Sequence, residues 1–501
     1  MALLPLRGKT TSAGVRRDTR GDALLVSETA AVVILAAGEG TRMKSRTPKV
    51  LHTMSGRSLL GHAIAAASDL DPERLVVVVG HAREEVSAAA LAAAPQADIV
   101  LQQQQLGTGH AVRMVIESVG AMSGTVIVTY GDMPLLRGRT LGELAGRHVA
   151  AGNAVTVLTA RGDFPGFGRI VRDADGSFLR IVEERDATEA ERAIDEFNSG
   201  CYAFDGALLA DAIKRVTTNN SQHEEYLTDL VEILRGDGHS VGTVIADDAA
   251  EIRGVNDRAQ LAQARRALND RILRDWMLAG VTVIDPASTW IDVTVTLGQD
   301  AEVGPQTQLL GSTVIGAGAK VGPGCLLEDT TVGEDAVLLN AVCRQSEICS
   351  RVTVGPFAYL RPGTRIAEDA HIGTYVELKK SHIGPGAKVP HLSYVGDANV
   401  GGGANIGAGT IFANYDGQHK HHTEVGEHAF IGSNTVLVAP VTIGDGAYTA
   451  AGSAIQQDVS AGDLGIARGL QHNSADWVLR NRQGTRSAEA ASARHRSDKT
   501  E

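Results

Sequence analysis

Residues 31–43 of this 501-residue chain read Ala-Val-Val-Ile-Leu-Ala-Ala-Gly-Glu-Gly-Thr-Arg-Met. The apolar run 31–34 predicts a buried parallel strand, and a turn with two glycines follows it directly. Glycines let the backbone approach a ligand closely, free N–H groups face an anion, and Arg42 and Lys49 supply positive charge. The stretch therefore predicts an α/β fold with a phosphate-binding loop, and an ordinary tight turn is the alternative.

This loop differs from the two common nucleotide-binding motifs. The Gly-Lys-Ser/Thr ending of a P-loop is absent, and Met43 stands where the dinucleotide fingerprint needs its third glycine. The whole string, closed by Pro-Lys-Val-Leu-His at 48–52, resembles the signature of sugar-1-phosphate nucleotidyltransferases.

Strand and helix patterns alternate from residue 30 to 250, with strands predicted at 75–79 and 125–129. This alternation is typical of a parallel α/β domain. Leu261, Ala264, Leu268, Ile272 and Trp276 then recur at steps of three and four, which predicts a helix over 257–278. We expect this helix to form an arm between two domains.

An acidic residue follows the predicted strand 125–129. Tyr130-Gly131-Asp132 lies at its carboxyl end, where open α/β sheets bind ligands. A carboxylate there can hold Mg²⁺ together with substrate phosphates. Capping of a helix N-terminus is the alternative role for Asp132.

The composition changes past residue 298, where 28 of the 57 glycines lie within 298–470. Aliphatic–glycine pairs recur there at steps of about six residues, which is the pattern of a β-helix built from hexapeptide repeats. The spacing slips near Val332, and the polar segment 414–423 interrupts it, so we expect a protruding loop there. The aliphatic members of the pairs are Ile315, Val321, Val332, Val354, Ile372, Ile383, Val395, Ile406, Val425, Ile431 and Ile443.

Polar side chains cluster inside this repeat, which otherwise requires small and aliphatic residues. A neutral imidazole is a base near physiological pH, so His391 is a candidate to take a proton from an amine. Glu377, 14 residues earlier, is a candidate to orient it. The other polar members are Arg361, Lys379, Tyr394, Asn405, Asn414, Tyr415 and Lys420.

From residue 33 to about 477 the chain resembles the bacterial bifunctional family that unites N-acetylglucosamine-1-phosphate uridylyltransferase and glucosamine-1-phosphate N-acetyltransferase activities. The strings Leu-Gly-Thr-Gly-His-Ala at 106–111, Asn-Ser-Gly at 198–200, Tyr-Leu-Thr-Asp at 226–229 and Gly-Val-Asn at 254–256 carry the match. The resemblance implies a Rossmann-like nucleotidyltransferase domain, a helical arm and a left-handed parallel β-helix of hexapeptide repeats. It also implies small-molecule substrates: UTP, N-acetylglucosamine-1-phosphate, glucosamine-1-phosphate and acetyl-CoA.

The resemblance further assigns residues to a nucleotide site. Lys49 and Arg42 would neutralise the triphosphate, and Asp132 with Asn256 would hold Mg²⁺. Glu183 as a surface carboxylate and Asn198 as a turn cap are the alternatives. The expected ligands of UTP or its sugar product are Leu35, Ala36, Ala37, Gly38, Lys49, Gln102, Gly107, Thr108, Tyr130, Gly131, Asp132, Gly168, Glu183, Asn198, Thr228 and Asn256.

A second set of residues would carry out acetyl transfer in the β-helix, with His391 as general base. Arg361, Lys379, Tyr394 and Asn405 would bind glucosamine-1-phosphate. Acetyl-CoA would contact Ala408, Asn414, Tyr415, Ser433, Ala451 and Arg468. The resemblance also implies a homotrimer in the cytoplasm, and Trp477 would either cap the β-helix or pack on a neighbouring subunit.

Bulk properties set the remaining expectations. A net charge of −12 argues against nucleic-acid binding, and the lack of a run of about 18 apolar residues argues against membrane insertion. The predicted segments are a disordered extension (1–29), a uridylyltransferase domain (30–254), a helical arm (255–280), a β-helix (281–470) and a C-terminal segment (471–501) disordered from about 484.

Two rival functions remain at this stage. A single-activity sugar-nucleotide pyrophosphorylase with a regulatory β-helix would not need His391 and Tyr394 together. A non-catalytic regulator of the same layout should have lost Lys49 or Asp132, and this chain keeps both. Pro390 stands before His391 where glycine is more usual in the family, and it should stiffen the segment that carries the base.

Overall fold

The computed structural model describes residues 29–162 and 166–497. The chain divides into two compact units between Ile272 and Leu273. This boundary falls inside α8 (Arg258–Leu278), which is the helix predicted over 257–278. The rest of the predicted extension at 1–29 lies outside the described residues, but Thr29 already begins the first strand.

A mixed sheet forms the centre of the first unit, with the order β11-β7-β10-β6-β1-β4-β5. Strands β1, β4, β5 and β6 are parallel to one another, as are β7 and β11. These strands are β1 (Thr29–Leu35), β4 (Arg74–Val79), β5 (Asp98–Leu101), β6 (Thr125–Tyr130), β7 (Val155–Arg161), β10 (Glu196–Asp205) and β11 (Val241–Ile245).

The sheet is not parallel throughout, because β10 runs antiparallel to β6 and β7. The hairpin of β8 (Arg169–Arg172) and β9 (Phe178–Val182) precedes it and pairs with it through β8. The connection before a strand sets its direction, and hydrophobic periodicity carries no information on direction.

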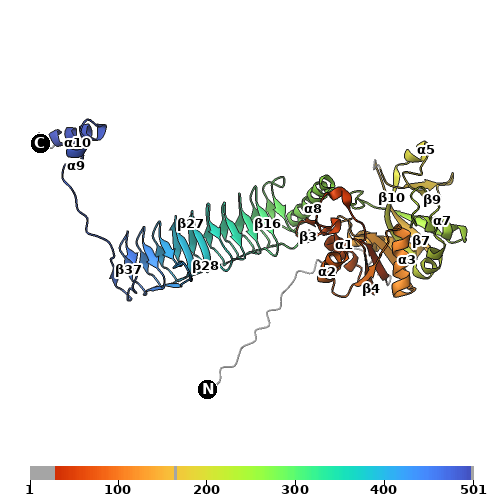
Figure 1. Cartoon of the computed structure of the whole chain (residues 1–501), viewed down its shortest axis with the longest axis horizontal. Helices are drawn as coiled ribbons and strands as arrows, with labels where there is room; N and C mark the ends of the chain where they lie inside the picture. Colours follow the sequence, from red (N-terminus) through yellow and green to blue (C-terminus); the bar gives the residue numbers. More distant parts are fainter. Residues whose placement is uncertain (1–28, 163–165, 498–501) are drawn as a thin grey trace, which may run out of the picture. The chain divides into compact units, whose positions relative to one another are not determined.

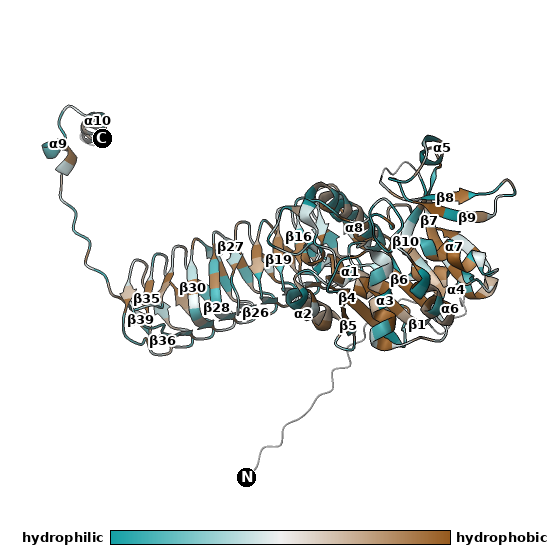
Figure 2. Cartoon of the chain, turned by 45° about the vertical axis from the view of Figure 1, so that its right-hand side comes forward, coloured by the Kyte–Doolittle hydropathy of each residue, from teal (hydrophilic) through white to brown (hydrophobic). Residues whose placement is uncertain are grey.

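Helices cover both faces of this sheet (Figures 1 and 2). Alternate side chains of β1 belong to two different cores. Val33 belongs to a core shared with α3 (Thr108–Val119), α6 (Gly206–Ala212) and α7 (Asp229–Gly236). Ile34 belongs to a core shared with α1 (Leu59–Ser68), α2 (Arg83–Ala93) and α4 (Gly138–Ala151). A strand covered on both faces explains the continuous apolar run at 31–34.

The second unit is a left-handed parallel β-helix whose short strands follow one another along the chain (Figure 1). Strands β12 (Thr282–Val283) to β39 (Leu464–Gly465) form one sheet of 11 strands and one of 17. All eleven aliphatic residues of the predicted repeat are buried, and none is more than 3% exposed. Each large side chain buried in this way stabilises the fold by roughly 1.5–3 kcal/mol.

Coil length explains both interruptions of the sequence pattern. One coil takes 18 residues from Thr296 to its partner Val314, but 16 residues from Val332 to its partner Ile348. The coil from Asn405 to Phe430 takes 25 residues because it contains the segment 414–423. The slip near Val332 and the inserted loop are therefore confirmed.

The prediction of disorder from about residue 484 is wrong, because α10 covers Arg486–Ser497 and follows α9 (Trp477–Asn481). Alanine and arginine have high helix propensity, and this local preference outweighs the polar composition that suggested disorder. In the described parts of the chain, no helix combines the length and apolar character needed to cross a membrane.

Candidate active sites

The loop after β1 is shaped around Lys49. Gly40 has φ +67°, and a Cβ atom there would collide with Cβ of Lys49, which begins the short helix η2 (Lys49–Leu51). Glycine at position 40 therefore lets the Lys49 side chain pack directly against the loop backbone. Across the loop, Nε2 of Gln105 donates to the Ala37 carbonyl at 2.7 Å.

Three residues far apart in sequence meet at the carboxyl ends of β1 and β6. Lys49 Nζ lies 2.5 Å from Asp132 Oδ2 and 3.2 Å from Asn256 Oδ1. The Val255 N–H donates to the Asp132 carbonyl at 2.8 Å, so the segment carrying Asn256 is held against Asp132 by the backbone. An ammonium group thus occupies a position where two oxygen ligands converge.

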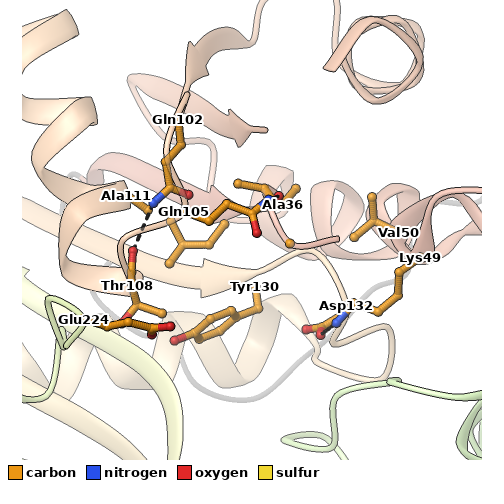
Figure 3. A pocket seen from close by; sticks show the side chains of 14 residues that line it. Ala36, Lys49, Val50, Gln102, Gln105, Thr108, Ala111, Tyr130, Asp132 and Glu224 are labelled. Atoms are coloured by element: carbon orange, nitrogen blue, oxygen red, sulfur yellow. Dashed lines mark hydrogen bonds and ion pairs between the residues drawn. The ribbon is translucent and has the colours of Figure 1, made fainter. Parts of the chain in front are cut away.

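A cavity of about 330 Å³ opens beside these groups. Figure 3 shows Lys49, Gln102, Thr108 and Tyr130 around it. The Gln102 amide donates to the Gly107 carbonyl at 3.0 Å and lies 3.1 Å from Nδ1 of His110. Because its NH₂ group is used in this way, Gln102 presents its oxygen as an acceptor.

A second cavity of about 420 Å³ shares Thr108, Tyr130 and Asp132 with the first. Glu183 lines it and accepts a hydrogen bond from the Thr228 hydroxyl at 3.5 Å. Burial raises the pKa of the Glu183 carboxyl. Two adjoining cavities can hold two ligands whose reacting groups meet near Asp132.

Asn198 lines the second cavity and also stabilises a turn. Its Oδ1 accepts from the Gly200 N–H at 2.9 Å, and its Nδ2 donates to the Tyr202 hydroxyl at 2.8 Å. The turn-cap alternative is therefore present in the structure, together with a position in the cavity wall.

Tyr130 separates the two cavities and depends on a glycine opposite it. Gly200 has φ +83°, and a Cβ atom there would lie 2.5 Å from Cε2 of the Tyr130 ring. Burial raises the pKa of Tyr130 well above its ordinary value, so its phenol stays neutral and able to donate.

The structure brings the predicted nucleotide-site residues together. Each lines one of the two cavities except Gly131, which joins Tyr130 to Asp132. Arg42 lines only the second cavity. Sequence reasoning missed several wall residues. Among four consecutive glutamines (102–105), the family resemblance indicated Gln102, but nothing distinguished Gln105, which also lines the cavity. The missed residues include Val50, Gln105, Ser199, Tyr202, Gln222, Glu224, Tyr226 and Gln260.

The oxygen atoms of Asp132 and Asn256 fit a hard divalent cation. A Cβ atom at Gly254 would lie 3.4 Å from Asp132 Oδ1, so glycine leaves room beside the carboxylate. Within 29–162 and 166–497, no group of three or more His, Cys, Asp and Glu side chains is arranged to hold a metal ion. Mg²⁺ commonly binds one or two protein oxygens together with phosphate oxygens from a ligand.

In the second unit, His391 belongs to a column of residues at one corner of successive coils. It ends β29 (Lys388–His391), and the Leu392 N–H donates to the Thr374 carbonyl one coil earlier, at 2.9 Å. Three further backbone hydrogen bonds continue the column from coil to coil. The N–H groups of Gly409, Asn434 and Gly452 donate to the carbonyl groups of His391, Ala408 and Ser433, respectively. The predicted residues His391, Ala408, Ser433 and Ala451 thus follow one another along the β-helix.

Gly373 makes room for the backbone of the strand that carries His391. A Cβ atom at Gly373 would collide with the carbonyl oxygen of Pro390. Pro390 itself lies within β29, so the unusual proline is accommodated in an extended strand. The imidazole of His391 is exposed at the end of this strand.

Three of the other predicted polar residues take part in two ion pairs. Arg361 Nη1 lies 2.9 Å from Glu377 Oε1, and Lys379 Nζ lies 3.0 Å from Asp397 Oδ2. Glu377 therefore binds Arg361, whereas the backbone register places Thr374 next to His391. The hypothesis that Glu377 orients His391 gains no support from this arrangement. Sequence reasoning missed Asp397.

The loop 414–423 is held by its own hydrogen bonds. Asp416 accepts from the backbone N–H groups of Gln418 and His419, both at 2.7 Å, and these bonds with that to His421 hold its pKa below its usual range. Lys420 Nζ lies 4.9 Å from the ring centroid of Tyr415. Asn414 is buried at the base of the loop, while Ser433, Ala451 and Arg468 are exposed and Asn405 is half-buried.

Comparison with known proteins identifies relatives along the whole chain. Residues 32–274 match the MobA-like NTP transferase domain, and residues 422–457 match the bacterial transferase hexapeptide (six repeats). The curated protein "Bifunctional protein GlmU" of Streptomyces avermitilis is 60% identical over 92% of this chain and 96% of its own length. The proteins of the same name from Thermobifida fusca and Nocardia farcinica are 57% and 52% identical, and the matches cover 94% and 92% of this chain and 99% and 95% of theirs.

Proposed function

The chain belongs to the GlmU family of bifunctional enzymes, and we propose how its two units divide the two reactions of that family. The protein is an N-acetylglucosamine-1-phosphate uridylyltransferase and a glucosamine-1-phosphate N-acetyltransferase. We assign uridylyl transfer to the two cavities around Asp132 and acetyl transfer to the column that begins at His391. The chain is similar to bifunctional relatives over nearly its full length. This similarity favours the assignment over a single-activity pyrophosphorylase and over a non-catalytic regulator.

In uridylyl transfer, an oxygen of the sugar phosphate attacks the α-phosphorus of UTP and pyrophosphate leaves. Such reactions depend on positioning and charge neutralisation more than on covalent help from the protein. The Gln102 oxygen is placed to accept from a uracil N–H, and Lys49 is placed to neutralise phosphate charge. Glu183 and Thr228 would hold the sugar in the second cavity.

The convergence of Lys49, Asp132 and Asn256 is the observation that carries this proposal. Asp132 and Asn256 would hold Mg²⁺, which would neutralise charge on the phosphates of UTP. The ammonium group of Lys49 donates to the same two oxygens, which supports their assignment as cation ligands. Arg42 would approach the phosphates from the wall of the second cavity.

In acetyl transfer, His391 would take a proton from the amine of glucosamine-1-phosphate. The nitrogen then forms a bond to the thioester carbonyl carbon of acetyl-CoA, the carbon–sulfur bond breaks, and CoA leaves as the thiol. Lys379 and Arg361 would bind the sugar phosphate, with Tyr394 and Asn405 beside the sugar. Small residues continue the column after His391, which suits an extended cofactor lying along it.

Both assignments can be tested in one incubation. The purified protein with glucosamine-1-phosphate, acetyl-CoA, UTP and Mg²⁺ should yield UDP-N-acetylglucosamine, free CoA and pyrophosphate, followed by mass spectrometry. Accumulation of N-acetylglucosamine-1-phosphate would contradict the first assignment. Absence of any acetylated product would contradict the second.

Gly200→Ala should impair uridylyl transfer specifically. The new methyl group would push the Tyr130 ring, because the Cβ position lies 2.5 Å from Cε2. We expect the KM for N-acetylglucosamine-1-phosphate to rise about 10-fold, as for a loss of roughly 1.4 kcal/mol in binding. Gly152→Ala is the matched control, since Gly152 also has positive φ (+61°) but no atom lies within 4 Å of its Cβ position. An equal effect of both substitutions would point to backbone strain and contradict the proposed role of Tyr130.

We further propose a cytoplasmic homotrimer assembled through the β-helix. Aromatic pairs lie exposed on that unit: Phe357 stacks on Tyr375 at 5.3 Å between ring centroids, and Phe430 on Tyr448 at 5.2 Å. Exposed aromatic residues of this kind are typical of subunit interfaces. Sedimentation equilibrium should give three times the chain mass of 52.4 kDa, and a mass of one chain would contradict the proposal.

A further inference from the structure

A carboxylate with no role in the scheme above lies between two residues of the acetyl-transfer site. Asp397 belongs to β30 (Tyr394–Val400), next to β28 (Glu377–Ile383), which carries Lys379. Its Oδ2 accepts from Lys379 Nζ at 3.0 Å and also from Nδ2 of Asn414. One oxygen atom therefore joins a proposed ligand of the sugar phosphate to a proposed ligand of acetyl-CoA.

The backbone adopts a restricted conformation to place this carboxylate. Asp397 has φ +49°, a region that few residues other than glycine adopt. At the preceding Gly396, a Cβ atom would lie 2.8 Å from Nδ2 of Asn414 and would collide with the Tyr394 hydroxyl. Glycine there leaves room for Tyr394 and Asn414 to meet, with their polar atoms 3.4 Å apart.

The Asp397 carboxyl is ionised at neutral pH. Burial would raise its pKa, but hydrogen bonds from Lys379 and Asn414, with the charges of Lys379 and Lys420, lower it overall. An ionised carboxylate only accepts hydrogen bonds, so the NH₂ group of Asn414 must face it. The carbonyl oxygen of Asn414 is then free to accept from a ligand, and Lys379 keeps donors for a phosphate.

The neighbouring ion pair differs in its exposure. Lys379 and Asp397 side chains are 15% and 17% exposed, whereas Arg361 and Glu377 are 40% and 41% exposed. Exposed ion pairs contribute little because solvent screens them, and less exposed pairs fix their members more firmly. Asp397 is thus the carboxylate better able to impose a direction on its partners.

We propose that Asp397 is a positioning residue for acetyl transfer. Its Oδ2 atom directs Lys379 toward the phosphate of the sugar and turns the Asn414 amide so that its oxygen can accept a hydrogen bond from acetyl-CoA. The inference rests on the proposed function of the second unit, which makes Lys379 and Asn414 site residues.

Asp397→Asn is the sharpest test, because asparagine has nearly the same shape and tolerates positive φ. The NH₂ group of the new asparagine is a donor, and it would face the donors of Lys379 and Asn414. We expect the KM for glucosamine-1-phosphate to rise and the kcat of acetyl transfer to fall, together by about 10- to 100-fold in kcat/KM, as for the loss of a charged hydrogen bond. Asp397→Gly, which also fits the backbone, should give a similar loss.

Asp369→Asn is the matched control. Asp369 also has positive φ (+60°) and forms an ion pair with Arg351 at 2.8 Å. Its side chain is 57% exposed, and Arg351 is not a proposed site residue. This variant should acetylate at the wild-type rate. Uridylyl transfer should be unchanged in all the variants, which verifies that the first unit is intact.

A double-mutant cycle separates positioning from a general structural effect. If Asp397 acts through Lys379, the effect of Asp397→Asn on the KM for glucosamine-1-phosphate should shrink several-fold in a Lys379→Met background. Equal effects in both backgrounds would overturn the inference. Wild-type acetyl transfer by the Asp397→Asn variant would also overturn the inference. If the wild-type protein itself shows no acetyl transfer, the proposed function is overturned as well.

Discussion

Asp132→Asn is expected to abolish most uridylyl transfer while leaving acetyl transfer intact. The substitution keeps the shape of the side chain but removes the charge that lies 2.5 Å from Lys49 and that would hold Mg²⁺ with Asn256. Loss of one such electrostatic contact at a reacting phosphate lowers kcat by about 10²- to 10³-fold. Pyrophosphate release from UTP and N-acetylglucosamine-1-phosphate measures the loss.

The metal dependence of the variant distinguishes a ligand from a structural residue. If Asp132 holds Mg²⁺, the concentration of Mg²⁺ that gives half-maximal rate should rise more than the KM for UTP. Asp98→Asn is the control in the same unit, because Asp98 pairs with Arg74 at 2.8 Å, is half-buried and lines neither cavity. A normal rate for Asp132→Asn, or equal loss of both activities, would contradict the separation of the two sites.

The β-helix is the part of the fold that the sequence determines most directly. Its period requires one buried aliphatic residue per short strand, and Ile315, Ile372 and Ile431 are all buried as expected. The period also contains information on side-chain contacts, since residues one coil apart stack. Arg351 and Asp369 are 18 positions apart, and they form an ion pair. Lys379 is in register with Gly396, 17 positions later, so Asp397 lies one residue beyond the stacked position and the repeat alone does not point to it.

Coil length itself varies, which limits such counting. Around Val332 a coil takes 16 residues, and the loop 414–423 lengthens another to 25. Arg361 and Glu377 are 16 positions apart, whereas the residue in register with Glu377 is Tyr359, 18 positions earlier, so this ion pair is diagonal. The hypothesis that Glu377 orients His391 gains no support from the register either, because the residue paired with His391 is Thr374.

The nucleotide site could be predicted in its parts but not in its geometry. Strand-end positions indicated the loop after 31–34 and Asp132, because carboxyl ends of neighbouring parallel strands share an edge. Asn256 lies 207 positions from Lys49, and only the resemblance to a family connected them. No period governs contacts at such separations, so the antiparallel direction of β10 was equally out of reach.

His391→Gln should reduce acetyl transfer by about 10²- to 10⁴-fold, the range expected when a general base is removed. Glutamine retains a polar side chain at the exposed end of β29 but cannot take a proton from the amine of glucosamine-1-phosphate. The column of Ala408, Ser433 and Ala451 would still bind acetyl-CoA, so the KM for acetyl-CoA should change little while kcat falls. Release of free CoA measures the reaction.

A matched variant identifies the role of His391 more firmly than the rate alone. His382→Gln provides the control, since His382 is an exposed histidine of the same unit with no assigned role. Wild-type acetylation by His391→Gln would show that another group, or the free amine form of the substrate, makes a protein base unnecessary.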